Sequence, residues 1–313
     1  MAVAAVIVTY NSADVINSCL KALSKMAPDV TPIIVDNASS DHTLDRVGAG
    51  SGARRIANPE NRGFAAAANQ GARAANEGEF ILLLNPDVEL STAVDQLTES
   101  ARRHGLAAGR LVDQAGRTQA GFTLRRFPTP SALVWELFGI NRLWPSNPVN
   151  RRYRCLDRDY DQPAMVEQPA GAFLMVRRDV WNQLGGFDEQ FYPVWFEDVD
   201  FCRRAVDAGY QIEYVPTVTA RHKGGHSVGT IPPGRRATYW CVSLLRYGAK
   251  HFQPGAFRGI CAAVALSSIP RMVAGMIAGR TLSSGAAYLK IMRFAGRCLV
   301  TPKHVRNTAV TVV

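Results

Sequence analysis

The sequence predicts an α/β protein whose central sheet is mostly parallel and covered by helices on both faces. Strand and helix patterns alternate through the first hundred of its 313 residues. The run 80–84 is entirely apolar, which is typical of a strand buried on both sides, as in a parallel sheet. Polar residues directly follow three of the predicted strands, at the carboxyl ends where open α/β sheets bind their ligands.

The elements are predicted from runs of β-branched and apolar residues and from apolar residues spaced three and four apart. In chain order they are a strand at 3–8, a helix with Ile16, Cys19, Leu20 and Leu23 on its apolar face, a strand at 32–35, a helix at 39–47, an extended piece around Ile56, a helix at 64–76 and a strand at 80–84. The stretch from 105 to 168 is irregular and rich in proline, apart from a strand at 105–112. The remaining elements are a strand at 171–176, helices at 179–184 and 198–208, the second closed by Gly209, and strands at 211–215 and 218–221.

The C-terminal part of the chain is helical and basic, which divides the sequence into an α/β domain at 1–230 and an amphipathic helical region at 231–313. Glu213 is the last acidic residue and 14 Lys or Arg residues follow it, whereas residues 1–213 carry 22 basic and 26 acidic residues. This asymmetry indicates an anionic partner.

The kind of anionic partner follows from what accompanies the charge. No helix-turn-helix, zinc-ligand or aromatic RNA-binding signature is found, so no nucleic acid is expected. Basic amphipathic helices are typical of an anionic membrane surface. The longest uncharged stretch, Gly259–Pro270, is too short to span a bilayer. The alternative is that these helices pack on the domain or on a second subunit, as in a homodimer.

The apolar N-terminal run at 1–8 lacks a basic leader and a cleavage site, so it is predicted to be a strand rather than a signal peptide. The six cysteines are scattered without a CxxC pair, which is typical of buried thiols in a reducing compartment. We therefore expect a cytoplasmic protein that is peripheral on the inner face of the cell membrane.

Three polar clusters stand at strand ends, namely Thr9-Tyr10-Asn11, Asp36-Asn37 and Asn85-Pro86-Asp87. Asp36 suits the hydrogen bonds of a nucleobase or ribose, and equally suits a cap on the following turn. Asp87 is an oxygen ligand of the kind that Mg²⁺ or Mn²⁺ prefers, although Asn-Pro-Asp is also a common turn.

Two further segments carry groups suited to catalysis. Glu197, Asp198 and Asp200 open a predicted helix, where carboxylates satisfy free N–H groups, and one of them is also placed to act as a general base. The neighbouring Trp195 offers an apolar surface for a sugar ring. His222 and His226 lie in a basic, glycine-containing loop suited to a diphosphate or to a metal shell, although a lone histidine is more often structural.

Taken together, these motifs resemble the inverting glycosyltransferases of family 2, which have the GT-A fold, and within it the rhamnosyltransferase-like branch. The resemblance covers about residues 3–230. It depends on the order and spacing of the following segments: 8–11, 35–39 with Asp41, 61–64 with Asn69, 84–87, 171–173, 185–189, 197–200, and His222 with Ser227.

The resemblance implies a role for each matching residue. The nucleotide would contact Thr9, Tyr10, Asn11, Asp36, Asn61, Arg62, Gly63, Asn69 and Asn85. Asp87 and His222 would hold Mg²⁺ or Mn²⁺, Asp198 would be the base with Glu197 beside it, and Gly171, Ala172 and Trp195 would face the acceptor. The family's metal motif usually has two aspartates, and here the first is Asn85, which is typical of this branch.

The implied activity is the inverting transfer of a sugar from a nucleoside-diphosphate donor, foremost L-rhamnose from dTDP-rhamnose, to a polyprenyl-diphosphate-linked or polysaccharide acceptor in cell-envelope synthesis. A glycosidase has no need of a nucleotide pocket, and a nucleotidyltransferase usually carries a Gly-rich basic loop where this chain has 10–13. The alternative is a catalytically inactive GT-A scaffold or binding protein at the membrane surface.

Overall fold

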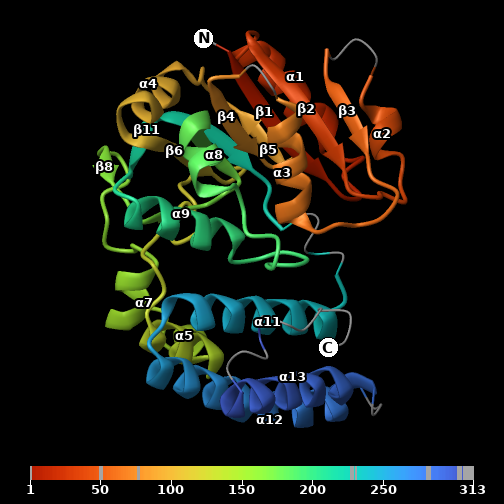
Figure 1. Ribbon diagram of the computed structural model, residues 1–313, viewed down its shortest axis with the longest axis vertical. Coiled ribbons are helices and arrows are strands. Elements are labelled where there is room, and N and C mark those ends of the chain that lie inside the picture. The colour runs from red at the N-terminus through yellow and green to blue at the C-terminus, as the bar shows by residue number, and fades with distance from the viewer. Residues whose placement is uncertain are drawn as a thin grey trace. The chain divides into compact units, whose positions relative to one another are not determined.

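The computed structural model describes residues 2–48, 52–75, 78–225, 229, 231–279, 283–301 and 305. These residues include a nine-stranded mixed sheet (Figure 1). Its strands are β1 (Val3–Thr9), β2 (Val30–Asp36), β3 (Arg54–Ala57), β4 (Phe80–Leu84), β5 (Val88–Leu90), β6 (Gly105–Val112), β8 (Ala164–Met165), β10 (Phe173–Arg177) and β11 (Gln211–His222). The order is β3-β2-β1-β4-β10-β6-β11-β5, with β8 also paired to β11.

Strands β3, β2, β1, β4, β6 and β11 run in one direction, and β10 lies antiparallel between β4 and β6. The mostly parallel sheet is confirmed. One difference concerns β11, a single long strand where the sequence indicated two. Its pairing with β6 shifts register between Val215 and Thr219, which is a bulge at the point where the apolar pattern is interrupted.

Helices cover both faces of the sheet, as predicted. They are α1 (Ile16–Met26), α2 (Thr43–Arg46), α3 (Phe64–Ala74), α4 (Asp95–His104), α8 (Arg178–Leu184) and α9 (Glu197–Asp207). Phe80, Leu82 and Leu84 of β4 pack in a core with α1 and α4, whereas Ile81 and Leu83 pack in a second core with α3, α8 and α9. Alternate side chains of β4 therefore lie in the two cores on opposite faces of the sheet. Both faces of the strand are buried, which explains why 80–84 has no polar residue.

The chain separates into two compact units. The first holds the sheet and comprises Met1–Phe127, Arg154–Glu189 and Glu197–Ser227, while the second comprises Pro128–Tyr153, Gln190–Phe196 and Val228–Val313. A short pair, β7 (Leu124–Arg125) with β9 (Gln168–Pro169), adds to the first unit.

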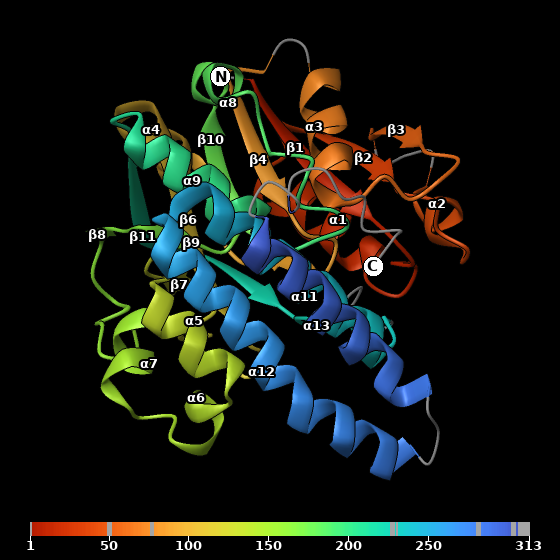
Figure 2. The same cartoon turned by 60° about the horizontal axis from the view of Figure 1, so that its bottom comes forward.

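Helices make up the second unit, and its elements are α5 (Pro130–Leu137), α6 (Ile140–Leu143), α7 (Pro148–Tyr153), α11 (Pro233–His251), α12 (Pro254–Gly279) and α13 (Ser283–Val300) (Figure 2). Helices α11, α12 and α13 contact one another, and α5 packs on α12, where Arg271 Nη2 donates to Leu137 O at 2.6 Å.

Among the described residues, α12 alone is long and apolar enough to cross a membrane, over Pro254–Ala274 with a mean hydropathy of 1.3. About two fifths of that window (39%) is buried inside the protein, and the core helix of a soluble protein meets the same criteria. Helices α11, α12 and α13 lie in the part of the chain predicted to be helical, and the domain division at residue 230 stays a prediction.

Candidate active site

The ends of β1 and β2 are joined by a network around Asp36, which is almost completely buried. Thr9 Oγ1 donates to Asp36 Oδ1 at 2.8 Å, and Ser39 donates to the same carboxylate from its hydroxyl at 2.6 Å and its amide at 3.0 Å. Asn11, whose φ of 51° is left-handed, joins this network because its amide donates to Ser39 Oγ. Asp36 therefore fixes the loop that follows β2, and the half-buried Tyr10 lies at the edge of the network.

The predicted nucleotide loop at 61–63 is tied to the end of β2 through Asn37. Asn37 Nδ2 donates to Asn61 Oδ1 at 2.9 Å, and the amide of Arg62 donates to Asn37 Oδ1 at 3.0 Å. Asn61 Oδ1 also accepts from the amide of Gly63, whose φ of 81° favours glycine at the start of α3. The Arg62 side chain is exposed and forms no ion pair within the described part of the chain. A rigid loop thus presents one available guanidinium group.

Asn69 lies elsewhere, inside the contact between α3 and the segment after α8. Its Nδ2 donates to Phe187 O at 2.9 Å and to Glu189 Oε1 at 3.0 Å, and its Oδ1 accepts from the amide of Phe187 at 2.9 Å. All donors of the amide are used within the protein, so Asn69 holds the 187–189 segment in place. Its predicted contact with the nucleotide stays a prediction.

Asp87 and His222 are brought together by the pairing of β5 with β11. The register places His222 opposite Val88, so Asp87 stands just beyond the last pair, and the amide of Lys223 donates to Asp87 O at 3.1 Å. Asp87 Oδ1 lies 3.6 Å from His222 Nε2, and both side chains are almost completely buried. Two residues 135 positions apart thus face each other at one strand end.

Gln119 fixes the proton position on His222. The Gln119 amide nitrogen donates to His222 O at 2.8 Å, so its oxygen must accept from His222 Nδ1, also at 2.8 Å. In the neutral imidazole the lone pair is therefore on Nε2, which faces the Asp87 carboxylate. Burial lowers the pKa of His222, and Asp87 opposes this effect. Phe122 stacks on the imidazole with ring centroids 4.8 Å apart. Two electron-rich groups face each other, which is favourable when a cation lies between them.

The residues present fit a divalent cation, with one carboxylate oxygen and one imidazole nitrogen oriented by a hydrogen bond on its far side. No group of three or more His, Cys, Asp or Glu side chains capable of holding a metal occurs within the described residues. Asn85, the residue that replaces the family's first aspartate, is half-buried beside Asp87 and bonds through its backbone amide to Ala172 O at 3.0 Å. Any cation here would need further ligands from water or a phosphate.

Asp198 lies in the first turn of α9, where its carboxylate is held by two backbone amides. Gly171 N donates to Asp198 Oδ2 at 3.0 Å and Val199 N donates to Oδ1 at 2.8 Å. Burial raises the pKa of Asp198, against the pull of these amides and of Arg125. A methyl group on Gly171 would lie 2.9 Å from Asp198 Cβ, so only glycine allows this approach. A carboxylate with a raised pKa in a fixed position is suited to accept a proton.

The other two acids of this turn are buried. Asp200 pairs with Arg204, whose Nε donates to Asp200 Oδ2 at 2.8 Å, while its other nitrogens donate to Leu184 O and Gly186 O. Asp200 therefore anchors α9 to the end of α8. Glu197 is 5% exposed, compared with the half-buried Asp198.

The contacts gather predicted site residues into two groups, one around Asp36 and one from Asp87 to Asp198, and leave Asn69 outside both. Contacts run from Asn85 through Ala172 and Gly171 to Asp198, which links the Asp87 segment to the base within the first unit. Trp195 belongs to the second unit, with 190–196. His226 and Ser227 lie outside the described residues.

Gln119 and Phe122, which orient His222, were not singled out from the sequence. They lie in the irregular stretch after β6, which returns to the sheet through an isolated bridge between Val112 and Thr118 and through the hydrogen bond from Gln119 N to Leu111 O at 2.9 Å. No motif marks such residues, since their role depends on a contact across 103 positions.

Comparison with known proteins shows the family of this chain. The profile described as "Glycosyl transferase family 2" matches residues 4–155, and that described as "N-terminal domain of galactosyltransferase" matches residues 151–225. The chain is 30% identical over 263 residues to the N-acetylglucosaminyl-diphospho-decaprenol L-rhamnosyltransferase of Mycobacterium tuberculosis H37Rv, covering 79% of this chain and 84% of that protein. It is 26% identical over 156 residues to the rhamnosyltransferase WbbL of Escherichia coli K12, covering 48% of this chain and 54% of that protein.

Solved structures share the fold at low identity. The crystal structure of GalNAc-T7 with UDP, GalNAc and Mn²⁺ superposes with a TM-score of 0.53 at 15% identity, covering 71% of this chain, which spans 44% of that chain. The structure of S. aureus TarS gives a TM-score of 0.50 at 14% identity, covering 95% of this chain and 55% of that chain.

Proposed function

This chain belongs to glycosyltransferase family 2, and we propose that it transfers a sugar, L-rhamnose from dTDP-rhamnose foremost, to a polyprenyl-diphosphate-linked acceptor with inversion. The observation that carries the proposal is the fixed Asp198 carboxylate, joined through Gly171 and Ala172 to the strand end that bears Asp87. The choice of donor and acceptor is supported by two relatives that are rhamnosyltransferases, one of which acts on a decaprenol-linked sugar by its name.

The donor's nucleotide would lie over the ends of β1 and β2. The Asp36 network orients the loop there, and the half-buried Tyr10 borders it. The exposed Arg62 is placed to meet the diphosphate with its guanidinium group. Asp87 and His222 are the residues that would hold Mg²⁺ or Mn²⁺, which when bound supplies positive charge to the departing diphosphate.

Asp198 acts as the general base. It takes the proton from the acceptor hydroxyl while that oxygen bonds to the anomeric carbon, and the bond from this carbon to the diphosphate oxygen breaks. Attack from the face opposite the leaving group inverts the anomeric configuration, and nucleoside diphosphate is the second product. Gly171 and Val199 hold the carboxylate through their amides, so its approach to the hydroxyl is set before the acceptor arrives.

A screen of nucleotide sugars tests the donor. Protection against thermal unfolding is measured with dTDP-rhamnose, UDP-sugars and GDP-mannose, each with and without Mn²⁺. We expect the largest shift with dTDP-rhamnose and Mn²⁺, and loss of the Mn²⁺-dependent part in Asp87→Ala. Equal shifts with and without Mn²⁺ in the wild type would contradict the metal assignment, and no shift with any donor would favour an inactive scaffold.

Turnover with a polyprenyl-diphosphate-linked acceptor tests the base. We expect Asp198→Asn to abolish release of nucleoside diphosphate while it keeps the affinity for the donor. Asp207→Asn, at an exposed carboxylate of the same helix, is the matched variant and should keep both. If Asp198→Asn retained near-normal turnover, the base would be another group, with Glu197 the next to be replaced.

The lipid-linked acceptor requires contact with a membrane, and the charge of the C-terminal region supports a peripheral location on the cytoplasmic face. All 14 Lys and Arg residues after Glu213 lack an acidic counterpart in that part of the sequence. An anionic leaflet provides the opposite charge at the surface where the acceptor lies.

A further inference from the structure

An apolar stripe runs along the exposed side of α12. Leu266, Ile269, Val273 and Ile277 follow one another at spacings of three and four residues, so they lie on one helix face. Their exposed fractions are 57%, 42%, 43% and 74%. The opposite sides of the helix are occupied, since Met272 and Met276 border α13 at Gly285 and Arg271 bonds to α5. An exposed stripe of large aliphatic side chains on a packed helix indicates an apolar partner.

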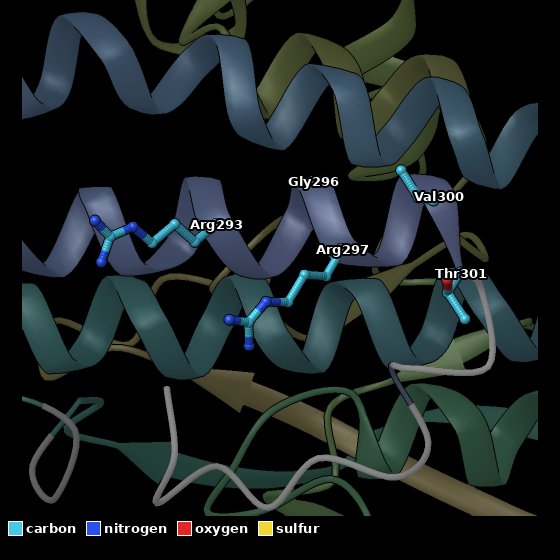
Figure 3. Close-up of a pocket in the computed structure, with 5 residues that line it drawn as sticks. All are labelled: Arg293, Gly296, Arg297, Val300 and Thr301. Atoms are coloured by element: carbon cyan, nitrogen blue, oxygen red, sulfur yellow. The ribbon is translucent and has the colours of Figure 1, made fainter.

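A basic groove lies on the neighbouring helix, α13, and is shown in Figure 3. It has a volume of about 520 Å³ and is lined by Arg293, Gly296, Arg297, Val300 and Thr301. The two arginines lie one helical turn apart and reach out from the same side of the helix in Figure 3, while Val300 points to the other edge. Neither arginine forms an ion pair within the described residues, and a Cβ on Gly296 would meet nothing within 4 Å. The groove is therefore open and positively charged.

The charge of this region decides among the possible partners. A second copy of the chain would bring one uncompensated basic surface against another, because no acidic residue follows Glu213. A bilayer with anionic lipids has both an apolar layer for the α12 stripe and phosphates for the α13 arginines.

We propose that α12 and α13 form a monotopic membrane-docking face, in which the α12 stripe enters the acyl boundary and the α13 groove receives the phosphate of an anionic lipid headgroup. The helices then lie in the plane of the interface, and α12 does not span the bilayer. The docking proposal rests on the proposed function and names the residues that would contact the membrane. Membrane binding is measured without turnover, so a failure of the docking proposal is distinguishable from a failure of the transferase proposal.

The test is sedimentation of the full chain with phosphatidylcholine vesicles, with and without phosphatidylglycerol, at low and high salt. We expect the wild type to bind the anionic vesicles and to be released by salt. Arg293→Ala with Arg297→Ala weakens binding by about fivefold for each arginine. Ile269→Ser with Ile277→Ser weakens binding at least tenfold and leaves the salt dependence in place.

Three further variants distinguish binding of a headgroup in the groove from effects of replacing any exposed residue. Gly296→Gln fills the groove without changing the charge, and it reduces the preference for phosphatidylglycerol if the headgroup enters the groove. Val206→Ser and Arg73→Ala alter exposed residues of the first unit and leave binding unchanged. Each variant is first shown to unfold at the wild-type temperature, which is expected because every replaced side chain is exposed or faces open space.

Several results would overturn the proposal. These are a wild type that does not bind anionic vesicles, stripe variants that bind like the wild type, and a wild type that resists extraction by salt and alkali, which would make α12 a spanning helix. A dimer in solution that the stripe variants convert to a monomer would assign the face to a second copy.

Discussion

Replacing Gly171 with alanine tests whether the contact between Gly171 and Asp198 positions the base. The new methyl group would lie 2.9 Å from Asp198 Cβ and 3.2 Å from its Oδ2. The two carbons must separate by about 0.6 Å to reach an ordinary contact of ~3.5 Å. Helix α9 is held by the fully buried Phe201, Cys202 and Ala205, so the carboxylate moves rather than the helix. The hydrogen bond from Gly171 N is stretched at the same time.

The expected losses of rate and of stability follow from this displacement of the carboxylate. A shift of 1 Å at a reacting group costs about 100-fold in rate, so we expect kcat to fall by about 10- to 100-fold. Overpacking by one methyl group costs about 1–3 kcal/mol, which lowers the melting temperature by about 2–10 °C. Donor affinity stays near the wild-type value, because the Asp36 network lies at other strand ends. The assay is release of nucleoside diphosphate at saturating donor and acceptor, with calorimetry for the donor.

Gly48→Ala is the matched control, since a methyl group there would meet nothing within 4 Å. If Gly171→Ala turned over as fast as Gly48→Ala, the contact would not position the carboxylate during the reaction. A loss of rate explained entirely by unfolding at the assay temperature would also count against the reasoning.

Three more outcomes follow from the site. Burial raises the pKa of Asp198 in the folded protein above the unfolded value of about 3.8. The stability that Asp198 contributes is therefore lost as the pH rises from about 3.8 through the folded pKa. Over that pH window the melting temperature of Asp198→Asn should rise relative to that of the wild type. Gln119→Leu removes both hydrogen bonds to His222, and we expect it to cost about 1–3 kcal/mol and to weaken Mn²⁺-dependent nucleotide binding by about 10- to 100-fold, measured by calorimetry. Asn69→Ala loses three hydrogen bonds to the 187–189 segment and should lower stability by about 2–3 kcal/mol with donor affinity unchanged, whereas lost affinity at full stability would make Asn69 a nucleotide contact.

The parts of the fold that the sequence predicted are those governed by local patterns. The strands at 80–84 and 105–112 were placed with their observed bounds, because continuous apolar runs between breakers admit few alternatives. The helix with Ile16, Cys19, Leu20 and Leu23 buries those four residues, since its periodicity is undisturbed by glycine or proline. Helix α4 was missed because only two of its ten residues, Leu97 and Ala101, are buried apolar side chains.

The parts that the sequence did not predict depend on long-range register. Strand β5 has three residues, and nothing local shows that it pairs with the end of β11 rather than with another edge. That pairing is what places His222 beside Asp87. In the same way, the packing of α5 on α12 joins residues 134 positions apart through Arg271 and Leu137. Such contacts depend on how the whole core packs. A sequence motif can therefore identify the residues of a site, but it does not give the distances between them.

Asn85 in place of an acid has a consequence for how metal and nucleotide bind. An imidazole ligand brings no negative charge, so the pair of Asp87 and His222 supplies a single negative charge to a divalent cation, and that charge is on Asp87. The diphosphate must supply the remaining negative charge. We therefore expect the metal alone to bind weakly, and the nucleotide to bind weakly without the metal. Linkage requires each to raise the affinity of the other by the same factor. Titrating Mn²⁺ with and without nucleoside diphosphate measures that factor, and tight binding of Mn²⁺ alone would show ligands beyond Asp87 and His222.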